Sequence, residues 1–405
     1  MGAELLLQFT LALAIVVVAA KAAGYVSARL GQPAVLGELL IGVILGPTVL
    51  DMIHWPLLGG GHLEEVFHLL AHLGVLLLMF IAGLEVELES MVQTGRPAVL
   101  AGFLGVITPV GLGALAVLPF GLGVREALGI GLVLAATSVS ISAQTLMELG
   151  VLRSRVGMTL LGAAVVDDVL AILLFSIFTA LVLGFGGGVL AVMWVLVRMI
   201  AVLGLAVVVG AWGMPRLAAV VDRLPISEGL MALAFVIALL YAWTAEALGG
   251  VAAITGAFLA GLLLARTPLR HAIDEGMHTL AYAWLVPVFF VSIGLGVNAR
   301  GLEAEDLFLA LTVLLVALVS KVLGAGLGAR LGGFSLREAL QLGVGMVSRG
   351  EVGLIIATTL MDDGIMDDRG FAMVVLMVLV TTLLTPIMLR AMFTAARPRS
   401  RPDGS

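Results

Sequence analysis

Long apolar segments, separated by short polar loops, run through the whole chain of 405 residues. A transmembrane helix needs about 20 predominantly apolar residues to cross the hydrocarbon core of a bilayer. Segments of roughly this length, some of them short or interrupted, occur thirteen times: 4–28, 33–50, 65–85, 97–121, 126–149, 156–184, 188–215, 228–247, 250–266, 277–298, 305–329, 336–361 and 370–394. The pattern predicts an all-α polytopic membrane protein with thirteen transmembrane helices and no separate soluble domain.

The composition agrees with a membrane protein, because 61% of the residues are hydrophobic and only 12% are charged. The sequence contains no cysteine, which excludes disulfides and cysteine-ligated metal sites. The net charge of −6 carries little information for a chain that lies mostly in lipid, and nucleic acid is not an expected partner. The first residues lack a basic region, so we interpret the first apolar segment as a retained span.

The basic residues predict how the spans are oriented. Lys and Arg are concentrated in the cytoplasmic loops of membrane proteins. If the N-terminus lies outside, fifteen of the 21 Lys and Arg residues lie at or near the cytoplasmic side and three lie outside. One span more or fewer would move every later loop to the other side and remove this bias. We therefore predict that the N-terminus lies outside and the C-terminus lies in the cytoplasm.

An internal repeat relates the two halves of the chain. Residues 33–48 match residues 252–267 at six of sixteen positions, and residues 83–86 resemble residues 294–297 in the spans that follow. The matching spans are seven apart, an odd number, so they cross the membrane in opposite directions. Spans 1–6 and 8–13 are therefore predicted to form an inverted-topology repeat with span 7 as a linker, which is typical of alternating-access transporters.

The repeat pairs the fifth span with the twelfth, and in such folds two broken helices meet at the bilayer midplane. The glycines and polar residues of the twelfth span, at 343–351, favour unwinding. The hydroxyls of the fifth span, at 137–142, can satisfy freed backbone groups or coordinate a cation. Nothing in the fifth span forces a break, so that part of the prediction rests on symmetry. The predicted fold contains two crossing discontinuous helices.

Two adjacent aspartates, Asp167 and Asp168, lie in the apolar segment 156–184. One carboxylate at the centre of a bilayer costs about 2.5–3.5 kcal/mol, so such a pair is a functional site by default. We predict an ion-binding or proton-binding site here, and the alternative is a structural pair neutralised by protonation or by a basic partner. Neighbouring helical residues project about 100° apart, so the two aspartates can serve different partners.

Three more charged residues lie within predicted spans: Lys321, Arg349 and Glu351. Lys321 is the only lysine besides Lys21. A buried lysine can lose its proton, whereas arginine effectively cannot. We therefore predict that Lys321 titrates, with service as a plain counter-ion as the alternative.

In combination, four motifs resemble bacterial sodium/proton antiporters of the NapA kind, in the electrogenic branch of the cation:proton antiporter superfamily. The resemblance covers essentially the whole chain, and its motifs are Val166-Asp-Asp-Val169, Ala136-Thr-Ser-Val-Ser-Ile-Ser-Ala143, Ser320-Lys-Val-Leu-Gly324 and Ser348-Arg-Gly-Glu-Val-Gly-Leu-Ile355. The related glutathione-gated potassium efflux proteins carry Gln-Asp where this chain has Asp167 and Asp168. They also carry a cytoplasmic nucleotide-binding domain that this sequence lacks, so we do not favour that function.

The resemblance implies a role for each residue of the site. Asp168 would be the main ion and proton site, Asp167 and Lys321 would form a salt bridge, and Thr137 and Ser138 would supply oxygens to the cation. It also implies a homodimer embedded in membrane lipid, with spans 4–6 and 11–13 as a moving core. The expected partners are sodium or lithium ions and protons, without a cofactor.

These interpretations divide the chain into six regions. In order, they are first-repeat dimerisation helices, first-repeat core helices, a linker helix, second-repeat dimerisation helices, second-repeat core helices and a short cytoplasmic tail: 1–96, 97–184, 185–227, 228–299, 300–396 and 397–405.

Other polar residues within spans have less specific interpretations. Arg349 and Glu351 could pair or cap half-helices in an unwound segment, and Glu85 could also reach Arg349. We expect a structural role for these residues and for Glu38, or contact with water in the case of Glu38. Arg198 in the linker span is expected to snorkel or to pair.

Two histidines, His68 and His72, share one helix face, as a metal-binding pair would. No third ligand is evident in the sequence, so we expect no metal site, although the pair could tune a response to pH. An external loop, expected to be solvated or to attract cations, carries four acidic residues: Asp362, Asp363, Asp367 and Asp368.

The sequence therefore predicts a secondary active transporter that exchanges sodium or lithium ions for protons by alternating access, with net charge movement. It is not predicted to be an enzyme, since no predicted span contains a Ser/His dyad or a His-Glu-x-x-His motif. Two alternatives remain open. One is a potassium/proton antiporter of the same fold, and the less favoured one is a channel-like or sensory membrane protein that uses the aspartates as a gate.

Overall fold

The described part of the chain is mostly helical and contains no strand. The computed structural model describes residues 2–58, 62–85, 95–182, 188–296 and 307–394. Its α-helices are α1 (Gly2–Arg29), α2 (Ala34–Leu45), α3 (His62–Glu85), α5 (Gly95–Val117), α6 (Val124–Ala135), α7 (Val139–Glu148), α8 (Arg155–Val182), α9 (Gly188–Val221), α10 (Gly229–Trp243), α11 (Ala253–Leu264), α12 (Arg270–Leu280), α13 (Val286–Leu295), α14 (Leu307–Leu331), α15 (Leu336–Gly345), α16 (Glu351–Asp362) and α17 (Asp368–Thr394). The predicted tail, 397–405, lies outside the described residues.

Ten helices within the described ranges are long and apolar enough to cross a membrane. The other three expected spans, 33–50, 250–266 and 336–361, contain shorter apolar helices: α2, α11 and α16. The all-helical membrane architecture is thus confirmed, whereas the count of thirteen crossings stays a prediction. Two of the short helices, α2 and α11, are the two segments that match in the internal repeat.

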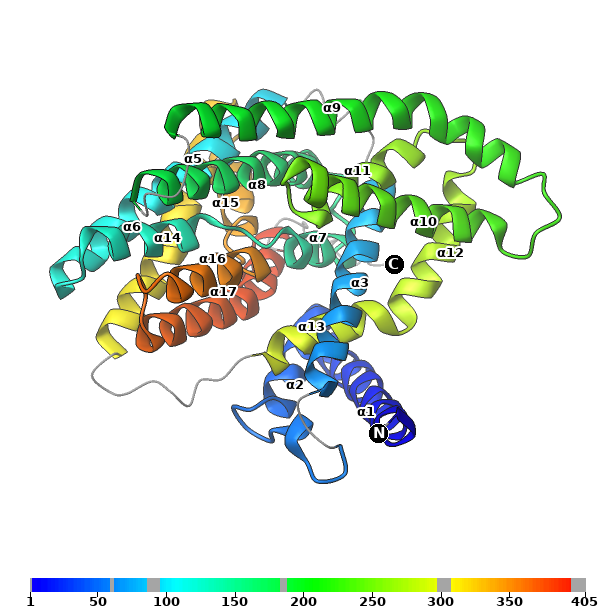
Figure 1. Cartoon of the computed structure of the whole chain (residues 1–405), viewed down its shortest axis with the longest axis horizontal. Coiled ribbons are helices and arrows are strands. Elements are labelled where there is room, and N and C mark those ends of the chain that lie inside the picture. The colour runs from blue at the N-terminus through cyan, green and yellow to red at the C-terminus, as the bar shows by residue number, and fades with distance from the viewer. Residues whose placement is uncertain (1, 59–61, 86–94, 183–187, 297–306, 395–405) are drawn as a thin grey trace, which may run out of the picture.

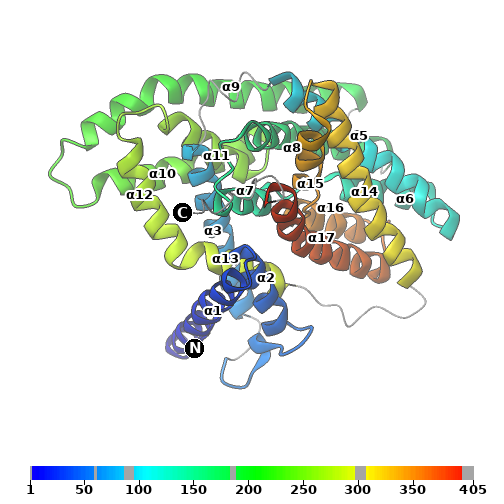
Figure 2. The ribbon, with the colours of Figure 1, turned by 180° about the vertical axis from the view of Figure 1, so that it is seen from behind.

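The helices form two groups that lie side by side (Figures 1 and 2). The core group consists of α5–α8 and α14–α17, in which α5 packs against α6, α8 and α14. The scaffold group consists of α1–α3 and α10–α13, in which α3 packs against α11 and α13. The long helix α9 runs along both groups in Figure 1. The role of each group in transport stays a prediction.

Small residues allow α5 and α14 to pack closely. A Cβ atom at Gly324 would lie 2.9 Å from the Thr108 hydroxyl, and one at Gly328 would meet the carbonyl group of Leu100. Glycines of this spacing let membrane helices approach each other closely. Lys321, one turn before Gly324, is thereby held in the interior with no exposed surface.

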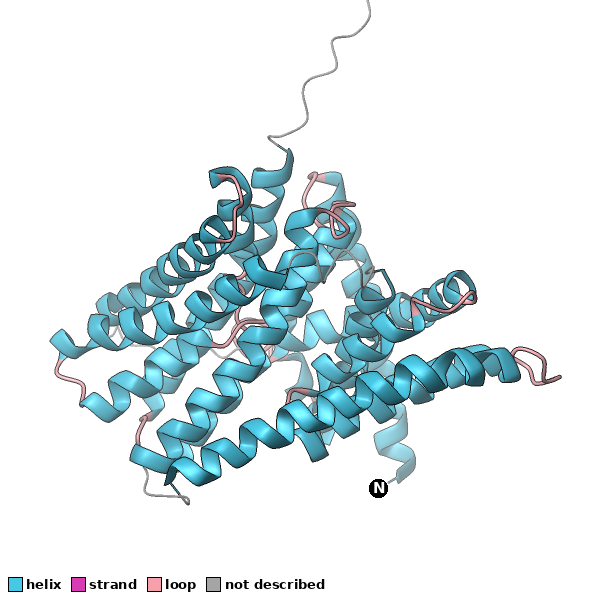
Figure 3. Ribbon diagram, turned by 90° about the horizontal axis from the view of Figure 1, so that it is seen from above, coloured by secondary structure: helices cyan, strands magenta, loops and turns pink. Residues whose placement is uncertain are grey.

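Two of the expected spans are broken into half-helices. The fifth expected span consists of α6 and α7, which are separated by residues 136–138 with extended backbone at Ala136 and Ser138. The twelfth consists of α15 and α16, which are separated by residues 346–350. Figure 3 shows loop segments inside the helix bundle as well as at its periphery. Both predicted discontinuities are therefore present.

Candidate ion-binding site

The two breaks meet and satisfy each other's backbone groups. The backbone N–H of Ser138 donates to the carbonyl oxygen of Ser348 over 2.8 Å, and the Ser348 hydroxyl donates to the carbonyl oxygen of Ser138 over 2.5 Å. The Ser142 hydroxyl donates to the carbonyl oxygen of Gly345 over 2.5 Å. Irregular backbone at membrane depth is tolerated only where its polar groups find such partners. Serines of both spans thus hold the crossing together.

Two half-helix N-termini converge at this crossing. Ser138 precedes α7 and Gly350 precedes α16. A Cβ atom at Gly350 would lie 2.7 Å from the Cβ of Ser138, so glycine permits the approach. Helix N-termini carry partial positive charge, which favours nearby anions. This places two positive helix ends within a bundle that also carries the buried aspartates.

Asp167 and Lys321 form an ion pair in the interior of the core group. Lys321 Nζ lies 2.6 Å from Asp167 Oδ1, and both residues are fully buried. The other carboxylate oxygen, Asp167 Oδ2, is buried without a hydrogen-bond partner among the described residues. A buried carboxylate oxygen in that position is costly unless it binds a proton, an ion or water. The role of this pair in ion or proton binding stays a prediction.

Arg349 donates hydrogen bonds to backbone carbonyl groups. Its guanidinium donates to the carbonyl oxygens of Met346 and Ala317, both over 3.2 Å, and it has no exposed surface. Met346 directly follows the half-helix α15 as its C-cap, and Ala317 lies one turn before Lys321 on α14. Arg349 thus fastens the break in the twelfth span to α14.

The expected contact between Glu85 and Arg349 is wrong. The carbonyl group of Glu85 accepts from Arg270, and its carboxylate lies near the charges of Arg153 and Arg270. Glu85 ends α3, whereas Arg349 lies at the crossing in the interior of the core group, so the two residues belong to different parts of the bundle. Glu351 begins α16, and its side chain lies outside the described part of the structure.

Asp168 contacts the scaffold group. The Thr255 hydroxyl of α11 donates to Asp168 Oδ2 over 2.8 Å. The two residues line a small cavity together with apolar side chains, including Val139, the neighbour of Ser138. Adjacent aspartates thus serve different partners, as the helical projection predicts.

Thr137 and Ser138 lie at the same crossing. The Thr137 hydroxyl is buried and makes a long hydrogen bond of 3.4 Å to the carbonyl oxygen of Ala135. The Ser138 hydroxyl lies 3.1 Å from that of Ser140. Their service as cation ligands stays a prediction.

Thr255 was missed by reasoning from the sequence. A signal for it exists in the internal repeat, where Thr255 aligns with Leu36. A hydroxyl that replaces leucine in an apolar helix marks a position where one half of the repeat requires a polar group.

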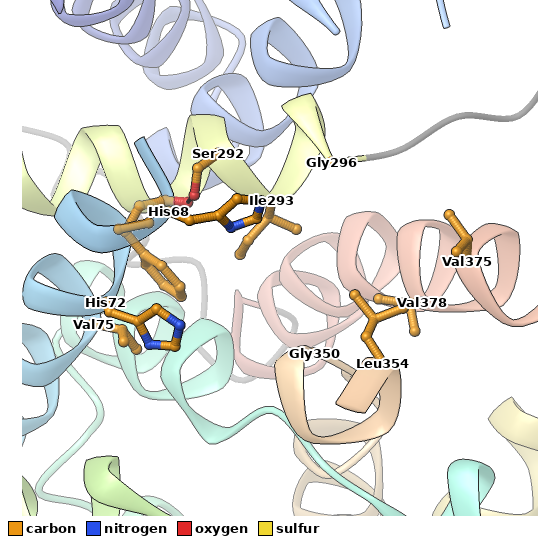
Figure 4. A pocket seen from close by; sticks show the side chains of 12 residues that line it. His68, His72, Val75, Ser292, Ile293, Gly296, Gly350, Leu354, Val375 and Val378 are labelled. Atoms are coloured by element: carbon orange, nitrogen blue, oxygen red, sulfur yellow. Dashed lines mark hydrogen bonds between the residues drawn. The ribbon is translucent and has the colours of Figure 1, made fainter. Parts of the chain in front are cut away.

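A second cavity lies between the two helix groups. Figure 4 shows His68 and His72 projecting from α3 toward the space that Leu354 of α16 and Val378 of α17 also line. The cavity reaches Gly350 at the crossing. No group of three or more potential metal-ligating side chains occurs in the described ranges.

A second polar network joins the core group to the scaffold group, at the end of α7 that lies away from the crossing. The Glu148 carboxylate at the end of α7 accepts from the backbone N–H groups of Ala34 and Val35, over 2.5 and 3.2 Å. These are the first two residues of α2, so a core carboxylate caps a scaffold helix. Gln144 donates to Glu148 over 2.8 Å and accepts from the Tyr282 hydroxyl.

The remaining polar residues of the expected spans contact neighbouring scaffold elements. Glu38 is buried on α2, near the charges of Lys21 and Glu148. Arg198 of α9 lies against Gly250, and its Nε is buried without a hydrogen-bond partner among the described atoms.

The chain is similar to known proteins along nearly its whole length. The chain matches the family described as "Sodium/hydrogen exchanger, transmembrane" over residues 13–395. It is 37% identical over 389 residues to the Na(+)/H(+)-K(+) antiporter GerN of Bacillus cereus, covering 96% of the chain and 97% of that protein. It is 34% identical over 384 residues to the Na(+)/H(+) antiporter of Enterococcus hirae, covering 95% and 98%.

Two more similarities extend to other organisms. The chain is 32% identical over 429 residues to the high-affinity Na(+)/H(+) antiporter NhaS3 of Synechocystis sp., covering 97% of the chain and 91% of that protein. The solved structure of the sodium proton antiporter MjNhaP1 from Methanocaldococcus jannaschii superimposes with a TM-score of 0.70 and 19% identity, covering 96% and 97%. At this identity the structural similarity shows a shared fold.

Proposed function

Because the chain belongs to the sodium/hydrogen exchanger family, we propose that it exchanges sodium ions for protons across the bacterial inner membrane by alternating access, and that lithium can replace sodium. The observation that carries this proposal is the arrangement of Asp167 and Asp168. One carboxylate is paired with Lys321 in the interior, and the other lines a cavity between the two helix groups. The chain is thus a transporter by family.

In the proposed cycle, the cation and protons compete for Asp168. A sodium ion needs an ionised carboxylate and further oxygen ligands, for which the hydroxyls of Thr137 and Ser138 are the candidates. Protonation of Asp168 removes the charge that holds the ion. Because each species displaces the other, entry of one is coupled to release of the other.

The proposed moving unit is the core group, which carries both aspartates, Lys321 and the crossing. The scaffold group would form a homodimer interface in the membrane, and α9 would link the two repeats. In the proposed orientation the N-terminus is outside and the C-terminus is in the cytoplasm. Alternating access then requires the core group to shift against the scaffold group, exposing the site to one face at a time.

The test is exchange by the purified protein in sealed proteoliposomes. Sodium, lithium or potassium is added outside, and an internal dye records the proton flux. We expect saturable proton movement with sodium and lithium, and none with Asp168→Asn, which keeps the side-chain volume but removes the titratable oxygen. Asp222→Asn, at an exposed position after α9, is the matched control and should exchange normally.

Three outcomes would contradict the proposal. Exchange by purified Asp168→Asn at a rate comparable to the wild type would refute the site. Flux that does not saturate and is not coupled to protons would indicate a channel. Exchange with potassium alone would indicate a potassium/proton antiporter of the same fold.

A further inference from the structure

The hydrogen bond between Thr255 and Asp168 joins the two helix groups. Thr255 is the third residue of α11, a scaffold helix that packs on α3 and α10. Asp168 belongs to α8, a core helix that packs on α5 and α15. A hydroxyl fixed to one group thus contacts a carboxylate fixed to the other, over 2.8 Å and with only 6% of Thr255 exposed.

A hydroxyl at this position suits every state of the carboxylate. It has one donor and two acceptor lone pairs, so it can donate to an ionised carboxylate or accept from a protonated one. It can also turn a lone pair toward a sodium ion, which prefers neutral and anionic oxygen ligands. The other side chains that line the cavity, such as Met79 and Phe258, are apolar. Thr255 and Asp168 are therefore the polar lining of this cavity.

The contacts between the two helix groups differ at the two faces. The second cavity, which His68 and His72 line, lies toward the face at which α3 begins. Gly296, at the end of α13, also lines it. Val75, which lines that cavity, is one turn from Met79, which lines the cavity of Asp168. Toward the opposite face, Glu148 holds the start of α2 and keeps the core and scaffold groups together.

We infer that Thr255 is a one-sided ligand, which supplies an oxygen to the cation at Asp168 only while the site faces the side at which α3 begins. This inference rests on the proposed function. If the core group moves, Asp168 travels with Thr137 but leaves Thr255 behind on the scaffold. A ligand that travels with the site acts on both faces, whereas a ligand on the scaffold acts on one. Thr255 would then make the cation affinity different on the two faces.

The test compares sodium affinity at the two faces. Right-side-out and everted membrane vesicles expose opposite faces, and the initial rate of proton exchange against sodium concentration gives a KM for each. Thr255→Val keeps the shape of the side chain and removes the hydroxyl. Thr255→Ser restores it, and Thr267→Val is the matched control, since the Thr267 hydroxyl bonds only within its own turn, to the carbonyl of Leu264.

We expect Thr255→Val to raise the sodium KM about tenfold or more at the face where α3 begins, the size expected for a lost hydrogen bond to a charged group. That face is the outer one in the proposed orientation. The KM at the other face should stay near the wild-type value, Thr255→Ser should restore the wild-type pattern, and Thr267→Val should change neither KM. Thr255→Ala, which adds no bulk, gives the same comparison if the valine variant does not reach the membrane.

The inference is overturned if removal of the hydroxyl changes the KM equally at both faces, or at neither. An equal change would make Thr255 a packing residue or a ligand in both states. These results differ from failure of the proposed function, in which the wild type itself would exchange no sodium for protons.

Discussion

Ser138 and Ser348 are joined by two hydrogen bonds that run in opposite directions between the broken helices. The backbone N–H of Ser138 donates to the Ser348 carbonyl, and the Ser348 hydroxyl donates to the Ser138 carbonyl. The polar groups freed by one break are thus satisfied by the other. Because Ser142 also donates to Gly345, the half-helices α7 and α15 are held as one unit. Any movement of the ion site is therefore expected to carry both breaks together.

The first prediction concerns pH. Protons and sodium compete for Asp168 in the proposed cycle, so acid occupies the carboxylate with protons and weakens sodium binding. The sodium KM should therefore fall as pH rises, by about tenfold per pH unit where a single proton competes, and should level off once the site is deprotonated. The midpoint belongs to the coupled cluster of Asp167, Asp168 and Lys321.

Proteoliposome exchange measured over a range of sodium concentrations at each pH checks this prediction. Competition changes the KM and leaves the maximal rate nearly constant. A KM that is independent of pH across the active range would rule out a shared site.

The second prediction concerns Thr137. Among the described residues its hydroxyl makes only a long bond to Ala135, so its removal should cost little stability. Thr137→Ala should raise the sodium KM about five- to tenfold, since one oxygen ligand is lost. The affinity for protons should change less, because protonation of Asp168 needs no such oxygen.

Sodium and proton dependence of exchange, measured on the same variant, separate the two effects. Thr145→Ala is the matched control, since the Thr145 hydroxyl is buried in α7 and bonds to its own turn at Ile141. If Thr137→Ala weakened both dependences equally with normal folding, Thr137 would be a packing residue.

The helix breaks and the buried charges could be predicted because they depend on residues close together in the sequence or on the internal repeat. The break in the twelfth span follows from its glycines, and the break in the fifth follows only from the repeat, yet both are present. The prediction that the buried charges are functional follows from their cost in lipid. Contacts between helices that are far apart in the sequence are harder to predict from local pattern. The repeat marks Thr255 as an unusual position but does not name its partner, and Glu148 lies in an ordinary sequence context. The partners of both residues are set by packing between segments far apart in the chain.

The error at Glu85 has the same origin. A span and its charges can be read from composition, but the depth and rotation of a helix depend on its neighbours. Glu85 ends α3 beside Arg270, and no sequence pattern distinguishes that position from one facing Arg349.

The third prediction concerns the cap that Glu148 provides to α2. Glu148→Ala removes the acceptor for the N–H groups of Ala34 and Val35, and loss of a helix cap costs about 1 kcal/mol. We expect a lower melting temperature for the purified protein in detergent. Glu246→Ala, at an exposed position after α10, is the matched control. An unchanged melting temperature for Glu148→Ala would show that water satisfies the start of α2 equally well.

The last prediction concerns charge movement and Lys321. Its ammonium group is paired with Asp167 at 2.6 Å, and we expect cation binding at Asp168 to release this pair. Lys321 could then lose a proton, in addition to the proton that Asp168 gives up. More than one proton would exchange per sodium ion, and net charge would cross the membrane in each cycle.

Voltage can drive such a cycle. One net charge moved across 100 mV contributes about 2.3 kcal/mol, whereas a tenfold concentration ratio corresponds to about 1.4 kcal/mol. A membrane potential of this size can therefore move sodium against a tenfold gradient. If Lys321 stays charged throughout, it only offsets Asp167, and the cycle is electroneutral.

Transport currents on a solid-supported membrane distinguish the two cycles. The wild type should give a current when sodium is added, and Lys321→Gln should give a smaller current per sodium ion exchanged, unless Asp167 still titrates alone. Lys321→Arg is the sharper variant, because it keeps a positive charge beside Asp167 but cannot release a proton. It should exchange sodium with less charge per cycle than the wild type. A wild-type protein that exchanges actively without any current would refute the electrogenic cycle, and equal charge per sodium ion in wild type and Lys321→Arg would show that Lys321 carries no proton.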